Sequence, residues 1–178
     1  MARKLSIMDS GWLMMETRET PMHVGGLALF AIPEDAPSDY MESVYRFMVE
    51  VDGVCRPFSQ KIQSRLPGRL DAAWVEDKNF DIDYHVRHSA LPRPGRVREL
   101  LALVSRLHAQ RLDPSRPLWE SYLIEGLEGN RFALYTKMHH SMVDGMAGMH
   151  LMQSRMASSA DENLPAPWSG EWDKRKKP

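Results

Sequence analysis

Cysteine is nearly absent from this sequence, and long apolar runs and an excess of either charge are missing as well. The single cysteine among 178 residues, Cys55, excludes an internal disulfide framework and fits a reducing compartment. No apolar run approaches the roughly 18 residues that a membrane-spanning helix needs, and no secretory apolar region follows the basic start at residues 1–4. The sequence therefore points away from disulfide-rich secreted proteins and from integral membrane proteins. We expect Cys55 to be a small buried thiol.

The charged residues are balanced, with 23 Lys and Arg against 24 Asp and Glu, which gives a net charge of −1. No strong field therefore points to nucleic acid as a partner. Hydrophobic residues make up 43% of the chain, enough for a core, and the length suits one domain. The 13 methionines are unusual. Since Met lines adaptable apolar surfaces, they favour long, flexible ligands, with a Met-rich core as the simpler alternative.

Hydrophobic periodicity and turn residues predict a chain that contains both helices and strands. Helices are predicted at residues 5–16, 38–52, 97–111 and from about 145 to 157. Ser6 with Asp9, and Asp39 with Glu42, are expected to cap the first two of them. Strands are predicted at residues 24–32, 70–75, 80–86, 118–126 and 131–139. The last two strands, which Glu-Gly-Asn joins, should form an antiparallel hairpin.

Three segments carry a more specific expectation. Residues 24–32 are continuously apolar, which predicts a strand buried on both faces. Residues 80–86 alternate apolar and acidic side chains, which predicts an exposed or edge strand; metal binding by its acidic residues and His85 is the less simple alternative. From residue 158 the periodicity stops. We therefore divide the chain into a domain at 1–160 and the start of a linker, or a flexible tail, at 161–178.

The most informative stretch is the end of the last predicted strand. Side chains alternate between the two faces of a strand, so His140 should share the more apolar face with Met138, and His139 should share the other face with Lys137. A strand end holds side chains rigidly beside a loop that opens a cleft, and reactive groups are often presented there. The alternative is a polar residue that simply meets water.

The two residues that follow also have two interpretations. Asp144 stands before a predicted helix, where Asp is a favoured N-cap. Gly145 could simply relieve a tight turn. The same residues could instead belong to a reactive centre with the histidine pair, and the stretch by itself leaves both interpretations open.

Three motifs occur together. Residues 139–145 read His-His-Ser-Met-Val-Asp-Gly, and residues 116–120 read Arg-Pro-Leu-Trp-Glu. Near the start, residues 5–9 read Leu-Ser-Ile-Met-Asp and residues 21–26 read Pro-Met-His-Val-Gly-Gly. The order of these motifs along the chain is that of the N-terminal half of the bacterial wax ester synthase/diacylglycerol acyltransferases. The sequence resembles that half over nearly its whole length. These enzymes belong to a larger group built like chloramphenicol acetyltransferase, which includes plant BAHD acyltransferases and peptide-synthetase condensation domains.

The resemblance implies the N-terminal domain of a chloramphenicol acetyltransferase-like two-domain fold, an α/β domain in which helices flank a mixed β-sheet. Members of the family are considerably longer than this chain and have a second domain of similar architecture. The resemblance thus implies a partner, the C-terminal half, either as a missing segment or as a separate chain. No convincing set of oxyanion donors is present in these residues, so we expect this half alone to be inactive.

The resemblance also implies a reaction, the transfer of a fatty acyl group from coenzyme A to a long-chain alcohol or to diacylglycerol. His140 matches the family's general base, and an imidazole titrates near neutral pH. Asp144 would either orient His140 or pair structurally with an arginine, and the resemblance favours the second role. Gly145 would keep the access channel open. His139 is the less certain catalytic partner and is expected to be structural.

Further expectations concern the surroundings of the site. Pro117 and Trp119 are expected to support the site by packing. Acyl-CoA is a substrate, and no cofactor and no metal are expected. The protein should be cytoplasmic and attach peripherally to a membrane or lipid-body surface, because both substrates live in lipid.

Two competing functions remain. A non-catalytic lipid-binding or interaction module would keep the same fold without turnover. A metal-dependent hydrolase would use His139, His140 and Asp144, but adjacent histidines on opposite faces of a strand are poorly placed to share one ion.

Overall fold

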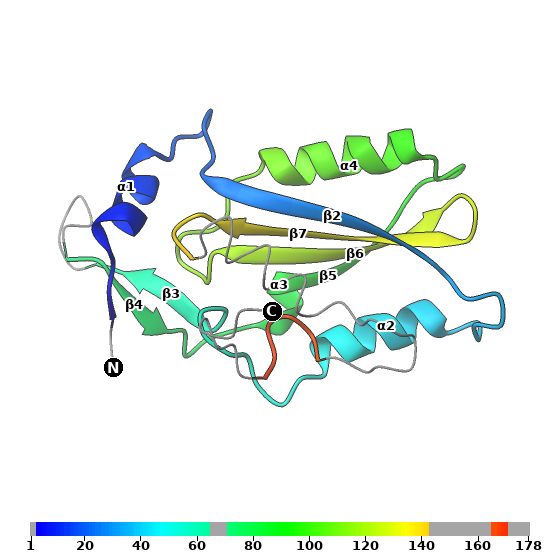
Figure 1. Ribbon diagram of the computed structural model, residues 1–178, viewed down its shortest axis with the longest axis horizontal. Helices are drawn as coiled ribbons and strands as arrows, with labels where there is room; N and C mark the ends of the chain where they lie inside the picture. The colour runs from blue at the N-terminus through cyan, green and yellow to red at the C-terminus, as the bar shows by residue number, and fades with distance from the viewer. Residues whose placement is uncertain (1–2, 65–70, 143–164, 171–178) are drawn as a thin grey trace, which may run out of the picture.

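The computed structural model describes residues 3–64, 71–142 and 165–170. Its elements form two sheets with helices around them (Figure 1). The four-stranded sheet has the order β2 (His23–Ala31), β7 (Arg131–His139), β6 (Trp119–Leu127), β5 (Val86–Ala90). The three-stranded sheet has the order β1 (Arg3–Lys4), β4 (Ala73–Glu76), β3 (Gln60–Gln63). The helices are α1 (Ile7–Met15), α2 (Tyr40–Val49), α3 (Ile82–His85) and α4 (Val97–Ala109).

The mixed α/β architecture agrees with the sequence-based prediction. β6 and β7 form the expected antiparallel hairpin, and β2 pairs antiparallel with β7 while β5 runs parallel to β6. The hairpin turn places Gly129 and Asn130 at φ 74° and 53°, the left-handed region that both residue types tolerate. β7 is therefore an interior strand, and the histidine pair lies at its end.

The two faces of the four-stranded sheet are covered differently. α4 lies along one face, and α2 lies near the other (Figure 1). The α4 face contains buried Leu100, Tyr122, Ile124, Ala133 and Tyr135. The opposite face carries the larger apolar core, with Trp74, Trp119, Leu123, Phe132 and Met138 among its buried members. Successive β7 side chains alternate between these two clusters, as the period of a strand predicts.

The expectation that residues 24–32 are buried on both faces is wrong. The strand forms as β2, but it is an edge strand, and much of its length is half-buried or exposed. Leu29 and Phe30 keep 43% and 38% of their surface exposed. A continuous apolar run indicates strand structure, but it does not reveal whether a neighbouring strand is present on each side.

The single exposed strand expected at residues 80–86 is also wrong. The segment makes the short helix α3, and the strand β5 begins at its last residue, Val86. Asp81 explains the helical turn, because its carboxylate accepts a hydrogen bond from the Asp83 backbone amide. His85 is 1% exposed in the core, not on a solvated face.

Helix starts were predicted with mixed success. Ser6 and Asp9 form the reciprocal capping box at α1. At α2 the side chain of Asp39 makes no capping hydrogen bond, and Glu42 pairs instead with Arg46 at 2.7 Å. Cys55 is half-buried, not fully buried as expected.

The described part of the C-terminal region, residues 165–170, packs on the core. Trp168 is 1% exposed, stacks on Trp119 with 5.0 Å between ring centroids, and donates its indole N–H to the Met48 carbonyl at 2.9 Å. Residues 165–170 therefore contribute to the core through Trp168. The proposed boundary at residue 160 remains a prediction, and the helix expected from about 145 to 157 lies outside the described residues.

Candidate functional site

The histidine pair is held from both sides because β7 lies between two strands. The His139 amide donates to the Leu118 carbonyl at 2.9 Å, beside β6. The His140 amide donates to the Met22 carbonyl at 2.9 Å, just before β2. The Pro-Leu-Trp motif, the Pro-Met-His motif and the histidine pair, which are far apart in sequence, thus meet through backbone hydrogen bonds.

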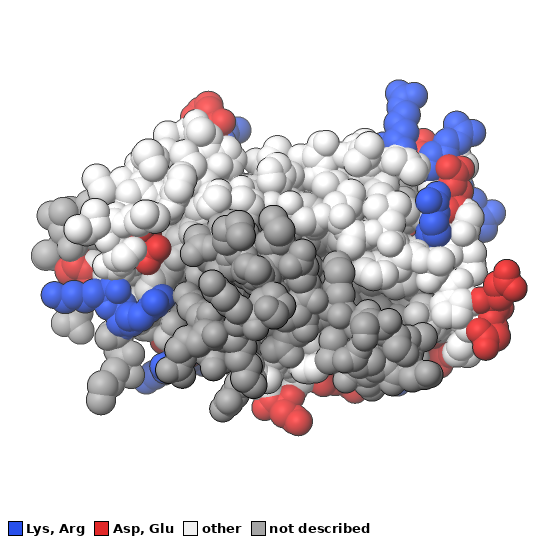
Figure 2. Space-filling view, viewed as in Figure 1, with Lys and Arg blue, Asp and Glu red and all other residues white. Residues whose placement is uncertain are grey.

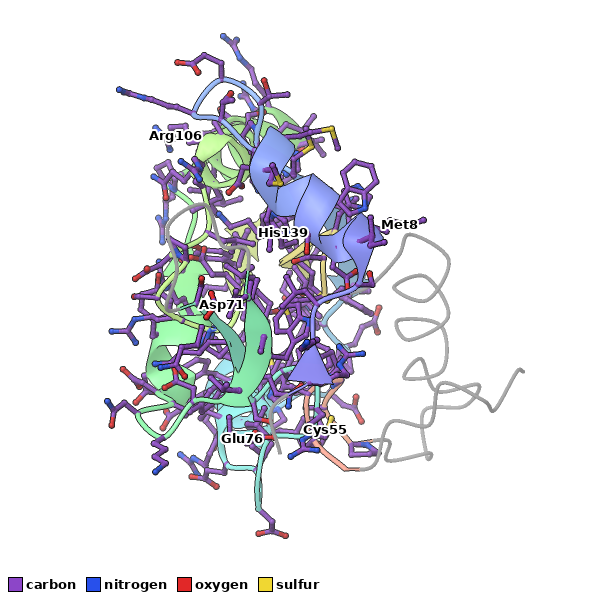
Figure 3. The ribbon with its side chains drawn as sticks, turned by 90° about the vertical axis from the view of Figure 1, so that its left-hand side faces the viewer. Met8, Cys55, Asp71, Glu76, Arg106 and His139 are labelled. Atoms are coloured by element: carbon purple, nitrogen blue, oxygen red, sulfur yellow. The ribbon has the colours of Figure 1, made fainter. Side chains whose placement is uncertain are left out.

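The side chains of the pair leave the strand in opposite directions, as alternation predicted. His139 is 1% exposed and lies toward Glu16, which ends α1. His140 is half-buried and lies against Trp12, also on α1. Figure 3 shows α1 passing beside His139, with Met8 on the outer side of the helix. One short helix therefore contacts both histidines.

His139 is occupied by structural hydrogen bonds. The Ser141 backbone amide donates to His139 Nδ1 at 3.0 Å, and the Ser141 hydroxyl lies 2.7 Å from the same nitrogen. Because a backbone amide can only donate, Nδ1 accepts, and the neutral ring carries its proton on Nε2. Nε2 lies 3.8 Å from Glu16 Oε1. The imidazole of His139 therefore fastens the turn that follows β7.

Glu16 joins this turn to two further elements. Its carboxylate accepts a 2.7 Å hydrogen bond from the Arg111 guanidinium and a 3.4 Å hydrogen bond from the Met22 amide. Burial acts to raise the pKa of Glu16, but the Arg111 hydrogen bond and the nearby His139 bring the pKa below its ordinary value. Glu16 is consequently a charged anchor for the end of α1.

His140 has a different environment. Its ring stacks on the Trp12 indole, with centroids 4.7 Å apart and an angle of 19° between the planes. Within the described part of the chain, neither imidazole nitrogen has a hydrogen-bond or ion-pair partner. A half-buried imidazole whose nitrogens are not engaged by these residues is available to exchange a proton with a bound substrate.

A buried polar network lies behind the pair, under α4. Lys137 is fully buried; its ammonium group donates to the carbonyls of Leu107 and Gln110 at 2.9 and 2.8 Å and lies 3.3 Å from Glu120. Glu120 also accepts a 2.6 Å hydrogen bond from Tyr122. Burial lowers the pKa of Lys137, and Glu120 opposes that shift. Lys137 thus ties the last turn of α4 to β7, two residues before the pair.

Pro117 and Trp119 are both buried. Trp119 stacks on His85 at 4.7 Å and donates its indole N–H to the Phe58 carbonyl at 2.9 Å. It does not contact the histidine pair through its ring, and the motif reaches the pair through the Leu118 carbonyl described above. Its packing environment agrees with the expected supporting role, which remains a prediction.

Asp144 and Gly145 lie outside the described residues, so their relation to His140 stays a prediction. Within the described ranges, no group of three metal-ligating side chains is arranged to hold an ion. In the same ranges, no helix is long and apolar enough to cross a membrane. On the face shown in Figure 2, acidic and basic side chains are interspersed toward the rim, and neither sign dominates.

Sequence reasoning did not find the contacts of Trp12 and Glu16 with the histidine pair. Both were treated as part of an ordinary helix, because contacts with residues more than a hundred positions away leave no local pattern. Lys137 did carry a signal, since a lysine interrupts an otherwise apolar strand face and buried lysines need partners.

Comparison with known proteins shows the family in which these motifs occur. A family model described as the wax ester synthase/diacylglycerol acyltransferase catalytic domain matches residues 5–177. An O-acyltransferase WSD from Acinetobacter baylyi is 42% identical over 177 residues, which cover 98% of this chain and 37% of that protein. A putative diacylglycerol O-acyltransferase from Mycobacterium bovis is 47% identical over 155 residues, covering 86% of this chain and 34% of that protein.

Solved structures agree with the fold. A wax ester synthase/diacylglycerol acyltransferase from Marinobacter aquaeolei VT8 superposes with a TM-score of 0.87 at 43% identity, over 94% of this chain and 40% of that one. The first condensation domain of the calcium-dependent antibiotic synthetase shares the fold alone, with a TM-score of 0.62 at 20% identity over 85% of this chain and 36% of that one. The chain spans little more than a third of the length of the curated relatives it matches.

Proposed function

Because the chain belongs to the wax ester synthase/diacylglycerol acyltransferase catalytic domain family, we propose that it is the histidine-bearing half of an acyl-CoA-dependent O-acyltransferase. The acceptor is a long-chain alcohol, which gives a wax ester, or diacylglycerol, which gives triacylglycerol. The relatives' names, O-acyltransferase and diacylglycerol O-acyltransferase, support this reaction class. The assignment to a residue depends on one observation: the half-buried imidazole of His140 makes no hydrogen bond or ion pair with the described residues.

In the proposed reaction, His140 acts as the general base. It removes the proton from the acceptor hydroxyl while the oxygen attacks the thioester carbonyl carbon of acyl-CoA. The tetrahedral intermediate then collapses, the carbon–sulfur bond breaks, and the protonated His140 gives its proton to the departing thiolate. The products are an ester and free coenzyme A, so no covalent acyl-enzyme, metal or cofactor is required.

His139 serves a structural role in this proposal. Its Nδ1 already accepts from Ser141, and its other nitrogen faces Glu16. The catalytic participation of Asp144 and the channel role of Gly145 remain proposals from the family motif. Asp144 would either orient His140 or pair structurally with an arginine, and the family motif favours the second role.

The proposed active form includes a second half, either as further residues of the same protein or as another chain. The curated relatives are much longer than the matched region, which covers 37% and 34% of them. The tetrahedral intermediate of acyl transfer also needs hydrogen-bond donors that stabilise its oxyanion. We propose that these donors and the opposite wall of the cleft come from that half.

The protein also acts at a lipid surface in this proposal. The wax ester or triacylglycerol product and both acceptors are apolar, so the cleft must exchange ligands with a membrane or lipid body. Attachment would be peripheral, and the proposed location is the cytoplasm.

A lipid-binding module without turnover is the alternative function. Exposed methionines on α1 favour it, since Met8 and Met14 keep 71% and 72% of their surface exposed and Met adapts to varied apolar ligands. Binding of acyl-CoA without release of thiol in any sample would support this alternative.

The test measures thiol released from palmitoyl-CoA with hexadecanol or a diacylglycerol as acceptor. The chain is assayed alone, with the second half, and with the second half plus His140→Ala. We expect transfer in the complete wild-type sample and a loss of about 10²- to 10⁴-fold in the His140→Ala sample. His88→Ala, which removes a part-exposed imidazole from the far edge strand β5, is the matched control. Unimpaired turnover by the His140→Ala sample would exclude His140 as the base.

A further inference from the structure

We propose that Trp12 is a positioning residue for His140: the α1 indole fixes the plane of the imidazole from which the proton is exchanged. This inference rests on the proposed function, because it assigns a role in the same reaction. Trp12 lies outside the three motifs, and nothing in the sequence of α1 by itself indicates this role.

The geometry of the ring pair supports the proposal. The centroids are 4.7 Å apart and the planes are nearly parallel at 19°, which lies in the range of favourable aromatic stacking. A histidine ring turns about its Cα–Cβ and Cβ–Cγ bonds, and hydrogen bonds to its nitrogens normally set that rotation. For His140 the described residues offer no such bond. The flat face of Trp12 is therefore the contact in this part of the chain that defines the ring plane.

The indole is well placed to do this because α1 is anchored at both ends. The capping box of Ser6 and Asp9 fixes the first turn. At the other end, Glu16 is bonded to Arg111 and lies against His139. Leu13, next to Trp12, packs on the large apolar core. An anchored helix can hold a neighbouring ring in place, whereas a frayed one could not.

The other histidine provides an internal comparison. His139 is oriented by the hydrogen bonds between its Nδ1 and Ser141, and its Nε2 lies 3.8 Å from Glu16 Oε1. Stacking orients His140 without using a nitrogen. Orientation by a ring face is thus compatible with a base whose nitrogens must stay free for substrate.

Stacking also has a chemical consequence. When the imidazole takes the proton from the acceptor hydroxyl, it becomes a cation that lies over the electron-rich face of the indole. Such a face attracts a cation within about 6 Å of its centroid. Phenylalanine can replace part of this effect, but leucine can only fill the space.

The first experiment reads the stack directly. Protein labelled with ¹³C in its histidine rings is examined by NMR, and the His140 resonance among the seven histidines is identified by its loss in His140→Ala. We expect the His140 Cε1–H signal to lie upfield because of the indole ring current. In Trp12→Leu the signal should move downfield toward that of a mobile histidine, while the His139 signal stays in place. An unchanged His140 signal in Trp12→Leu would overturn the proposed contact.

The second experiment measures its effect on turnover, in the sample that shows acyl transfer. We expect Trp12→Ala and Trp12→Leu to lower kcat roughly ten- to hundredfold, as small misplacements of reacting groups do, with KM for acyl-CoA little changed. Trp12→Phe should restore most of kcat. Leu13→Ala is the matched control, because it removes a neighbouring core contact of the same helix without touching His140.

The outcomes separate the two proposals. If no wild-type sample transfers acyl groups, the proposed function fails. If wild type is active and Trp12→Leu loses no more kcat than Leu13→Ala, the positioning role fails and Trp12 is a packing residue. Circular dichroism on each variant identifies unfolding, and Trp12→Phe, which keeps a ring, decides the question if Trp12→Ala does not fold.

Discussion

The two faces of the four-stranded sheet bury different kinds of side chains. The face under α4 mixes apolar side chains with a polar network in which Lys137, Glu120 and Tyr122 are bonded to one another and to the end of α4. The opposite face is an apolar and aromatic core, in which the side chains of Ser121 on β6 and Thr136 on β7 are hydrogen-bonded to each other. Adjacent residues of β7 belong to opposite faces, so the two neighbouring histidines fall into these two environments.

The difference supports the proposed assignment of His140, rather than His139, as the base. On the face under α4, His139 accepts a hydrogen bond from the Ser141 amide and lies beside Glu16, and these contacts orient its ring. His140 reaches the end of the other face, where it meets an indole rather than a donor or acceptor. A strand of alternating character can therefore supply a rigid support and an available base from consecutive positions.

The largest expected effect comes from breaking the polar face at Lys137. Lys137→Met leaves the Glu120 carboxylate buried without its closest cation and removes two hydrogen bonds from the end of α4. We expect a loss of about 3–5 kcal/mol in the free energy of unfolding, measured by urea denaturation. The double variant Lys137→Met with Glu120→Gln should lose less than the single one, because it leaves no buried carboxylate without Lys137, and Arg87, which lies 3.9 Å from Glu120, has a part-exposed side chain. Equal losses in both would argue against the charge pairing.

A smaller loss is expected from His139. In His139→Ala the buried Ser141 amide loses its acceptor, which costs about 1–3 kcal/mol in the free energy of unfolding. His140→Ala should have little effect on the same quantity, since its side chain makes no hydrogen bond to the described residues. The comparison fails if His140→Ala proves the more destabilising of the two in thermal or urea unfolding.

Two neighbouring glycines of β2 test the packing of the faces. A Cβ on Gly25 would lie 2.8 Å from the Tyr135 hydroxyl and 3.1 Å from His108 Nδ1, whereas a Cβ on Gly26 would meet nothing within 4 Å. Gly25→Ala should therefore push apart the 2.7 Å contact between Tyr135 and His108 and cost about 1–2 kcal/mol of stability. Gly26→Ala is the control, and a melting temperature near that of wild type is expected for it.

The smallest effect is a pH dependence to which both faces contribute. Burial lowers the pKa of His23 on the α4 face and of His85 in the apolar core. Each ring donates one N–H to a backbone carbonyl, and its other nitrogen is buried without a partner among the described residues. The unfolded state thus binds more protons than the folded state once the pH falls to the ordinary histidine pKa of 6.5 and below.

Stability should accordingly decrease as the pH falls from 7 to 5, by at most about 1.4 kcal/mol per pH unit for each histidine. His85→Gln and His23→Gln should each flatten this dependence in denaturation experiments at several pH values. A slope unchanged in both variants would show that neither imidazole is responsible.

The sequence predicted those features that depend on local pattern. The β6–β7 hairpin, the α1 capping box and the opposite orientation of His139 and His140 all follow from turn residues, caps and strand period. The family motifs predicted the fold. The predictions that were wrong concern features that depend on neighbouring elements. β2 lies at the edge of its sheet among the described strands, and His85 is buried because its ring stacks on Phe80 and on Trp119.

The sequence predicted which residues belong to the candidate site, but not how they are arranged in space. The histidine pair was correctly expected at the end of β7, while the contacts of Trp12 and Glu16 with it could not be foreseen from sequence spacing. Roles for Asp144 and Gly145 remain predictions. A sequence motif identifies candidate reactive residues, and contacts between distant residues then determine which imidazole nitrogens are engaged in hydrogen bonds.

The position of Trp168 has a consequence for how the protein is made. Trp168 lies on Trp119 and is bonded to the end of α2 through the Met48 carbonyl, so the aromatic core is assembled from the middle and the late part of the chain. A ribosome must therefore release residues well beyond β7 before this core can close. Until then the nascent chain presents an uncovered tryptophan beside finished strands, which is the kind of surface that chaperones hold and that truncated products expose to aggregation.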